Sequence, residues 1–182
     1  MRKYLFAFAA ALCIMSLGGC SKDASKDIVG SYTYKTSGTV TLMASKLAGL
    51  DAATLAAYKA AGVNVDPVVV GLYPEQGQMH VIAKDGSAND VIITFNDLLG
   101  NADVTEGVVN GNALTLSSGN MKAAQLTDGK EKIGAGIVAY SGSGRKYDDV
   151  LIIGIEYQGV FTIDGVEMTV IASDINCVAQ AN

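Results

Sequence analysis

The stretch GVFTIDGVEMTVIA (residues 159–172) indicates the fold more clearly than any other part of the sequence. Residue types that favour β-strands, among them Val, Ile, Thr and Phe, stand on both sides of Asp164-Gly165. An Asp-Gly pair supplies the backbone conformations that a two-residue hairpin turn requires. The stretch therefore predicts two antiparallel strands joined by a tight turn.

Segments of the same kind recur along the chain and are separated by turn residues. Asn110-Gly111-Asn112 predicts a second tight hairpin, which joins strands at 104–109 and 113–117. The other predicted strands lie at 28–43, 68–73, 79–83, 91–95, 137–141 and 149–157.

Two segments between these strands need separate interpretation. Segment 119–136 is ambiguous, because residues 121–126 suit a helical turn and residues 128–136 suit a loop. The stretch SGRK (143–146) is interpreted as a turn.

One helix is predicted, at about 51–61. Asp51 is placed as its N-cap, and Leu50 and Leu55 flank this cap as a hydrophobic staple. Gly62 stands where a glycine commonly ends a helix.

The apolar side chains of the helix and of the turn before it must be buried somewhere. We expect them to pack on the inner sheet face and to close one end of a barrel or trough. They are Leu47, Leu50, Leu55 and Tyr58. The expected fold is mainly β: an antiparallel up-and-down barrel or strongly curved sheet of about 8–10 strands with one early α-helix. A sheet wrapped around that helix is an alternative.

The beginning of the chain predicts export. Met1-Arg2-Lys3 is a positive cap, and Tyr4–Leu17 is an uncharged run too short to cross a bilayer. Leu17-Gly18-Gly19-Cys20 resembles the lipobox of bacterial lipoproteins. The resemblance implies a signal peptide at 1–19, a diacylglyceryl group on Cys20, and attachment of the chain to a membrane through that group.

The residues after Cys20 bear on the location of the protein. Ser21, in place of an Asp that retains many lipoproteins in the inner membrane, favours the outer membrane. The polar tether at 20–27 begins CSKD and is similar to the stems of Bacteroides-type lipoproteins. The resemblance leaves both the periplasmic face and the cell surface open.

The remaining residues, 28–182, suit a single β-rich domain. Removal of 1–19 deletes Arg2 and Lys3 but no acidic residue, and so lowers the net charge of −5 by a further two units. This acidity argues against nucleic acid as a partner, because such binding needs Lys and Arg to neutralise phosphates.

The first strand carries a second resemblance. Gly30-Ser31-Tyr32, within IVGSYTYKTSGTVTL, resembles the G-x-Y/W opening strand of lipocalin-like or calycin-like barrels. That resemblance implies a β-barrel that binds a small molecule.

The sequence predicts no enzyme, no cofactor and no metal site. His80 is the single histidine, and we expect it to face solvent or a polar sheet face. Cys177 has no Lys, Arg or His within five residues to activate it, and we expect it to be packed in the last strand or tail. Most Asp residues stand in turns, where Asp favours the backbone conformation.

Aromatic and apolar side chains are the remaining candidates for ligand binding. In a closed sheet they either line a cavity or fill an ordinary core. The candidates are Tyr32, Tyr34, Leu55, Tyr58, Phe95, Tyr140, Tyr157 and Phe161.

Two functions are compatible with these features. The first is an outer-membrane-anchored lipoprotein that binds a hydrophobic or amphipathic, lipid-like small molecule without catalysis. The alternative is an interaction or scaffold subunit of a cell-envelope complex that has no ligand cavity. A lined cavity of about 300 Å³ or more would favour the first.

Overall fold

The computed structural model describes residues 27–182. The predicted signal peptide (1–19) and Cys20, with all of the predicted tether except Asp27, lie outside the described residues. The elements are β1 (Gly30–Ala44), α2 (Ala52–Ala60), β2 (Val68–Leu72), β3 (Gln76–Ala83), β4 (Asp90–Asp97), β5 (Ala102–Asn110), β6 (Ala113–Thr127), β7 (Lys132–Tyr147), β8 (Val150–Ile163) and β9 (Val166–Ala181).

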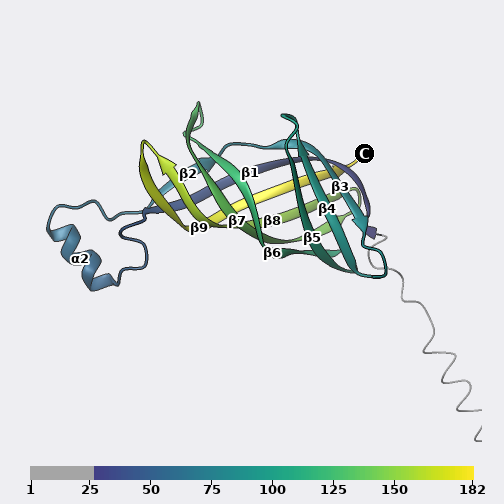
Figure 1. Ribbon diagram of the computed structural model, residues 1–182, viewed down its shortest axis with the longest axis horizontal. Helices are drawn as coiled ribbons and strands as arrows, with labels where there is room; N and C mark the ends of the chain where they lie inside the picture. The colour runs from purple at the N-terminus through teal and green to yellow at the C-terminus, as the bar shows by residue number, and fades with distance from the viewer. Residues whose placement is uncertain (1–26) are drawn as a thin grey trace, which may run out of the picture.

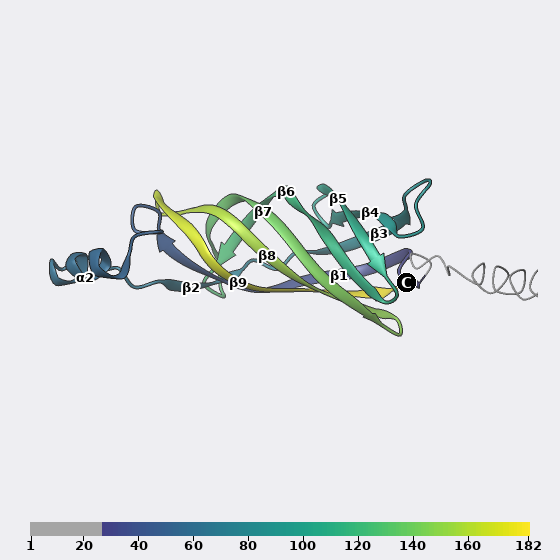
Figure 2. The same ribbon diagram turned by 90° about the horizontal axis from the view of Figure 1, so that it is seen from below.

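The strands form one antiparallel sheet that closes on itself. Neighbours in the sheet follow the order β2-β1-β3-β4-β5-β6-β7-β8-β9, and pairing of β1 with β9 completes the ring (Figures 1 and 2). The prediction of a mainly β, barrel-like curved sheet with one early helix is therefore confirmed.

The two ends of the barrel are built differently. The first half of β1 pairs with β3, whereas residues 39–42 pair with β2. β2 in turn pairs with the end of β6, at 71–72 and 126–127. β4 and β5 are therefore part of the wall only toward the end where β1 begins.

Turn chemistry explains the hairpins. Asp164 and Gly165 have φ values of 50° and 77°, and they connect the paired residues Ile163 and Val166 as predicted. Positive φ at both central positions matches the twist of the flanking strands. Gly111, with φ of 61°, serves the predicted hairpin between β5 and β6.

Large apolar side chains fill the barrel interior. Along β8, buried Leu151, Ile153 and Tyr157 alternate with exposed residues, which is the period-two pattern of a half-buried strand. Burying each such side chain stabilises the fold by roughly 1.5–3 kcal/mol. The axis of the barrel is thus a packed core.

Three expectations about the later strands were wrong. β6 runs through the ambiguous segment to Thr127, and β7 already begins at Lys132. SGRK lies inside β7, and the turn is made instead by Asp148 and Asp149. Several inner positions of β7 are glycines, Gly134 among them. Because glycine has no apolar side chain, the sequence shows no alternating apolar pattern there that would predict a strand.

The local structure of the helix agrees with the prediction. Asp51 caps its N-terminus by accepting a hydrogen bond from the Thr54 N–H at 2.9 Å. At its C-terminus, the Gly62 N–H donates to the Lys59 carbonyl and the Val63 N–H to the Tyr58 carbonyl. This pair of bonds is the Schellman motif.

The predicted position of the helix was wrong. α2 lies beyond the end of the barrel, away from the C-terminus, and none of its residues is buried (Figures 1 and 2). Leu50 and Leu55 are only half-buried and Tyr58 is 44% exposed; Leu47, in the preceding turn, is buried. The barrel core is filled by its own strands, so the inner face offers no room for the helix.

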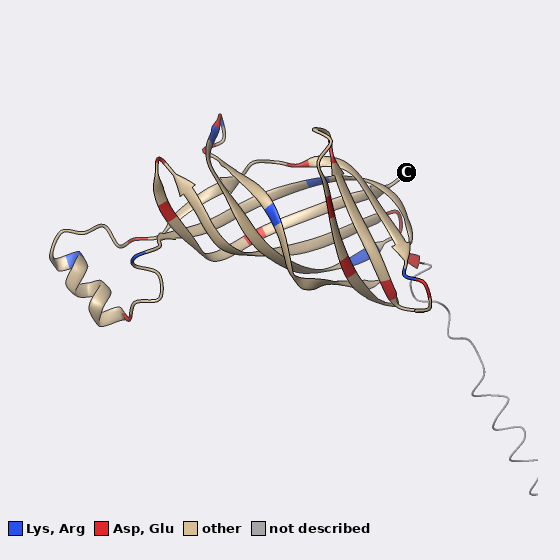
Figure 3. Ribbon diagram, in the orientation of Figure 1, with Lys and Arg blue, Asp and Glu red and all other residues tan. Residues whose placement is uncertain are grey.

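Charged residues are spread thinly over the strands and turns (Figure 3). Within residues 27–182, no helix has the length and apolarity that spanning a bilayer requires.

Candidate functional site

The wall of the barrel opens where β5 separates from β6. These strands pair only between 107–110 and 113–116, whereas β6 continues and meets β2 much later. Tyr73, Pro74 and Glu75 separate β2 from β3 on the other side of this opening. Proline has no N–H to donate, so the hydrogen-bonded ladder is broken at this point.

A hollow of about 340 Å³ lies at this opening, and we call this hollow the side cleft. Its walls come from β1, β4, β5, β6 and the junction between β2 and β3. They are Tyr34, Glu75, Phe95, Asp97, Asn101, Ala102, Asp103, Met121, Lys122 and Ala123. An adjoining outer hollow of about 350 Å³ shares Glu75, Asp97, Asn101 and Ala123.

Two aromatic rings form the apolar wall of the side cleft. Tyr34 and Phe95 pack edge to face, with ring centroids 5.3 Å apart and planes at 79°. Such a pair contributes about 0.5–1.5 kcal/mol beyond the area it buries. Burial raises the pKa of the Tyr34 hydroxyl above its usual range, and the negative charge of Glu75 adds to this effect. Tyr34 is therefore neutral at physiological pH.

An ion pair crosses the side cleft. The Lys122 Nζ lies 2.5 Å from Glu75 Oε2, and the two side chains are 16% and 22% exposed. Glu75 is held in place by β1, because its N–H donates to Thr36 Oγ1 and its carbonyl accepts from the Thr36 N–H. Removing one partner from a mostly buried pair leaves the other charge without compensation.

Two tyrosine hydroxyls lie buried behind the side cleft without a hydrogen bond to any described residue. They belong to Tyr140 and Tyr157, which face each other across β7 and β8. The Tyr140 hydroxyl lies near the side chains of Asp103 and Thr105. Burial raises the pKa of both hydroxyls, and the charge of Asp103 raises that of Tyr140 further.

The two aspartates of the side cleft have different roles. Asp97 accepts hydrogen bonds from the N–H groups of Leu99 and Asn101 and from the Asn101 side chain, which lower the pKa of its carboxyl. It therefore holds the turn between β4 and β5. Asp103 is half-buried and pairs with no cation among residues 27–182.

The mouth of the side cleft has an apolar rim. Leu98 and Leu99, at the tip of the β4–β5 turn, line the adjoining outer hollow and are 72% and 82% exposed. Met121 and Ala123 lie opposite on β6, and exposed Ile137 is the neighbour of Ala123 on β7. Exposed apolar side chains gathered around a hollow are typical of a ligand-binding or interaction site.

The predicted ligand-binding residues fall into three groups. Tyr34 and Phe95 line the side cleft, and Tyr140 and Tyr157 lie behind it. Tyr32 and Phe161 belong to the packed core, where the Tyr32 hydroxyl donates to the Ile28 carbonyl. Leu55 and Tyr58 lie on α2, which stands apart from the strands of the barrel (Figure 1).

Sequence reasoning missed the polar half of the site, which consists of Glu75, Lys122 and Asp103. The one available signal was the Pro74-Glu75 interruption between two predicted strands. Lys122 lies in the segment that was ambiguous between helix and loop.

The residues with reactive side chains are outside the site. His80 is exposed on β3, where its Nδ1 lies 2.9 Å from Ser31 Oγ, in agreement with the prediction. Cys177 is buried in β9 as expected, and burial raises the pKa of its thiol to about 12. Between residues 27 and 182, no cluster of three or more His, Cys, Asp or Glu side chains is arranged to hold a metal ion.

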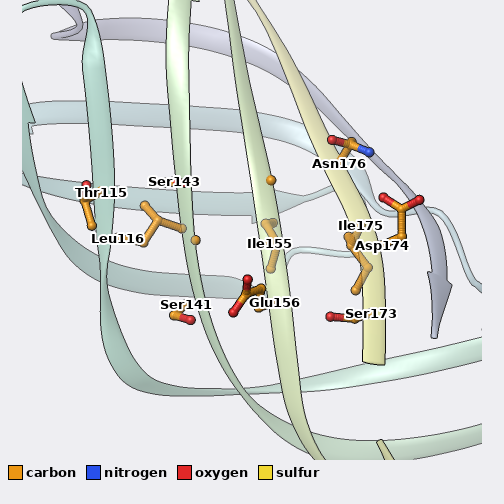
Figure 4. A pocket seen from close by; sticks show the side chains of 12 residues that line it. Thr115, Leu116, Ser141, Ser143, Ile155, Glu156, Ser173, Asp174, Ile175 and Asn176 are labelled. Carbon is orange, nitrogen blue, oxygen red and sulfur yellow. The ribbon is translucent and has the colours of Figure 1, made fainter. Parts of the chain in front are cut away.

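Another hollow, of about 420 Å³, lies over β6–β9 (Figure 4). Its labelled side chains, among them Ser143, Glu156 and Asn176, are spread along neighbouring strands (Figure 4). Small residues such as Gly142 and Gly154 account for the hollow, which has no aromatic wall. The side cleft is therefore the stronger candidate.

No family model matches the chain, and comparisons with curated proteins and with solved structures likewise find no match. The resemblances to bacterial lipoproteins and to lipocalin-like barrels therefore stay predictions from the residues that carry them.

Proposed function

We propose that this chain is a lipid-anchored, non-enzymatic binding protein that holds an amphipathic small molecule in the side cleft. The observation that carries the proposal is the combination, in one hollow of about 340 Å³, of buried polar groups inside and exposed apolar side chains at the mouth. Ligand sites commonly pair an apolar lining with a few placed polar groups.

The packed axis of the barrel favours the side cleft over an end-on pocket. Small barrels either fill their interior with side chains or hold one small ligand. Here Leu42, Leu126 and Phe161 fill the interior with no exposed surface. A ligand is therefore expected to enter through the wall, with its polar head near Lys122 and Glu75 and its apolar part against the rim.

Anchoring through Cys20 in the outer membrane is part of the proposal. Asp27 lies at the end of the barrel where β1 begins, and its carbonyl accepts a hydrogen bond from Lys146. A chain from Cys20 to Asp27 spans at most about 25 Å when extended. This end of the barrel would therefore face the membrane, with α2 pointing away from it.

The chemistry of the side cleft supports binding without catalysis. Its tyrosine hydroxyl is protonated at physiological pH, and the buried thiol of Cys177 is equally unreactive. His80, the single histidine, lies outside the cleft. The remaining polar groups are suited to hold a ligand rather than to attack it.

Mass spectrometry of the natively purified protein tests the proposal. We expect a carried small molecule that is lost from Tyr34→Ala and from Lys122→Met. Tyr58→Ala is the matched control, because it removes an equivalent ring from α2 and should retain the ligand. The proposal would be contradicted if Tyr58→Ala lost the ligand while Tyr34→Ala and Lys122→Met retained it.

The exposed helix favours a second candidate, an interaction subunit of an envelope complex. α2 is well capped at both ends yet has no buried residue, and Lys59 forms an ion pair with Asp66 that braces the loop after it. Site-specific photo-cross-linking in cells from position 58, with position 147 as the control, tests this role. A discrete adduct from position 58 alone is expected.

A further inference from the structure

We infer that the polar head of the bound amphiphile is a short extended peptide, whose main chain hydrogen-bonds to the free strand edges of β5 and β6. This inference rests on the binding function proposed above. It names the chemical class of ligand for the same cleft, which is an acylated peptide.

The edge of β6 beside the side cleft has unpaired main-chain groups. The Gln125 carbonyl accepts a hydrogen bond from the Tyr73 N–H at 2.8 Å, so the main chain of Gln125 faces away from β7. Residues two positions apart in a strand direct their main-chain groups to the same side. The N–H and C=O groups of Ala123 and Met121 therefore face the opening too. Because β2 has ended at this level, they pair with no strand in the described part of the chain.

The edge of β5 on the other side of the opening is free in the same way. The Val109 N–H donates to the Asn89 carbonyl, on the side of β4, and the register between β4 and β5 is continuous. Odd-numbered residues of β5 therefore direct their main-chain groups toward β4, and even-numbered residues direct theirs toward β6. Ala102 and Val104 are even-numbered, and β5 pairs with β6 only at 107–110. Their N–H and C=O groups thus have no partner strand within the described residues.

The side cleft lies between these two edges. Ala102 lines it on the side of β5, and Met121 and Ala123 line it on the side of β6. At its narrow end the Asn120 side chain spans the distance between the strands, where its Nδ2 donates to Thr105 Oγ1. A side chain replaces the backbone ladder here, so the strands have already separated beyond the spacing of a paired ladder. Two free edges therefore border one hollow.

Free strand edges identify the chemistry that they bind. An unpaired edge is a template for another extended chain, because it offers N–H donors and C=O acceptors at the spacing of a strand. When a peptide adds to such an edge, its main chain provides affinity, and pockets for alternate side chains provide specificity. The rings of Tyr34 and Phe95, at the inner side of the cleft, form a surface for one inward-facing side chain.

The apolar rim explains why the peptide needs an acyl chain. Leu98 and Leu99 line the outer hollow, which shares Ala123 with the side cleft. Both leucines are exposed, and an alkyl chain that leaves the cleft would cover them. A peptide without this chain would leave the rim in contact with water.

Isothermal titration calorimetry with three amphiphiles tests the inference. The probes are a dodecanoyl tetrapeptide amide of alternating serine and valine, the same molecule with every peptide nitrogen methylated, and dodecyl maltoside. Each is used below its aggregation concentration. Methylation removes the N–H donors but keeps the acyl chain and the carbonyls. We therefore expect the unmethylated peptide to bind about tenfold more tightly than the methylated one, or better.

A proline substitution locates the effect. Ala123→Pro removes an N–H that faces the cleft and leaves the ladder to β7 intact, because proline is tolerated where its nitrogen lies at a free edge. It should weaken binding of the unmethylated peptide by about tenfold and leave dodecyl maltoside unchanged. Val69→Pro is the matched control and should change neither, because Val69 lies on β2 beyond the residues that pair with β6 and does not line the cleft.

Circular dichroism establishes that each variant folds. If Ala123→Pro does not fold, the comparison of the two peptides on the unaltered protein decides the question by itself.

The outcomes separate the two proposals. If none of the probes binds, the binding function and this inference both fall. If the two peptides bind with equal affinity, or if only dodecyl maltoside binds, the binding function stands and the peptide assignment is overturned. A folded Ala123→Pro that retains full affinity for the unmethylated peptide also overturns it. The same holds if Ala123→Pro changes the oligomeric state in sedimentation and not the affinity, because the edge then pairs with a second copy of the chain.

Discussion

The Lys122–Glu75 pair gives the sharpest test of the energetics of the side cleft. Removing one partner of a fully buried pair costs about 3–5 kcal/mol, whereas an exposed pair contributes about 0–1 kcal/mol. The two side chains are 16% and 22% exposed, which lies between these limits. We therefore expect Lys122→Met to lower the free energy of unfolding by about 2–3 kcal/mol.

The double variant separates the pair from its surroundings. Glu75→Gln alone should destabilise the fold for the same reason, because it leaves Lys122 charged and unpaired. Combining it with Lys122→Met removes both charges, so the double variant should cost about 1–2 kcal/mol less than the sum of the single changes. Met keeps most of the apolar stem of the lysine side chain.

Urea denaturation followed by circular dichroism measures these differences, provided that the slope of each transition is unchanged. A coupling energy below about 0.5 kcal/mol would show that the pair behaves like an ordinary surface contact. In that case the side cleft would be open to solvent, and the reasoning from its burial would fail.

Further predictions concern the barrel, its buried hydroxyls and its anchor. Gly77→Ala should destabilise the barrel by about 1–3 kcal/mol, because an added Cβ would lie 1.9 Å from a backbone oxygen of β4. Gly154→Ala is the control, because its added Cβ would lie 3.7 Å from the nearest atom, the Ser143 carbonyl oxygen. The same urea assay should show that this control variant is tolerated. Burial raises the pKa of Cys177 to about 12 and those of Tyr34, Tyr140 and Tyr157 above their usual range. These groups lose protons more readily in the unfolded chain, so the free energy of unfolding should fall as the pH rises above about 9. Absorbance titration of the native protein should show that tyrosinate forms only at a higher pH than in free tyrosine. A free energy of unfolding that stays constant up to about pH 11 would contradict this prediction. Cys20→Ser should abolish partitioning into the detergent phase, and normal partitioning of that variant would exclude lipidation at this residue.

The fold was largely predictable from the sequence, because local chemistry determines much of it. Asp164-Gly165 and Gly111 mark hairpins through the backbone conformations they permit, and Asp51 and Gly62 mark the ends of the helix. Each of these signals acts over a few residues, and each agrees with the structure.

What could not be predicted depends on contacts between distant segments. The inner positions of β7 are partly glycine, as at Gly134, so its first residues gave no apolar period even though they pair with β8. The position of α2 depends on whether the barrel leaves room for it. Glu75 and Lys122 are far apart in sequence, and they meet only because β2 breaks at Pro74.

The opening between β5 and β6 also has a consequence for hydrogen exchange. A closed ring of strands protects its amides by pairing every edge, but residues 102–106 of β5 have no strand on the side that faces β6. Amides there should exchange with deuterium faster than those of β8 and β9, each of which has a paired strand on both sides. Occupation of the opening would slow exchange at this place selectively, so the protein itself can report binding without a label on the ligand.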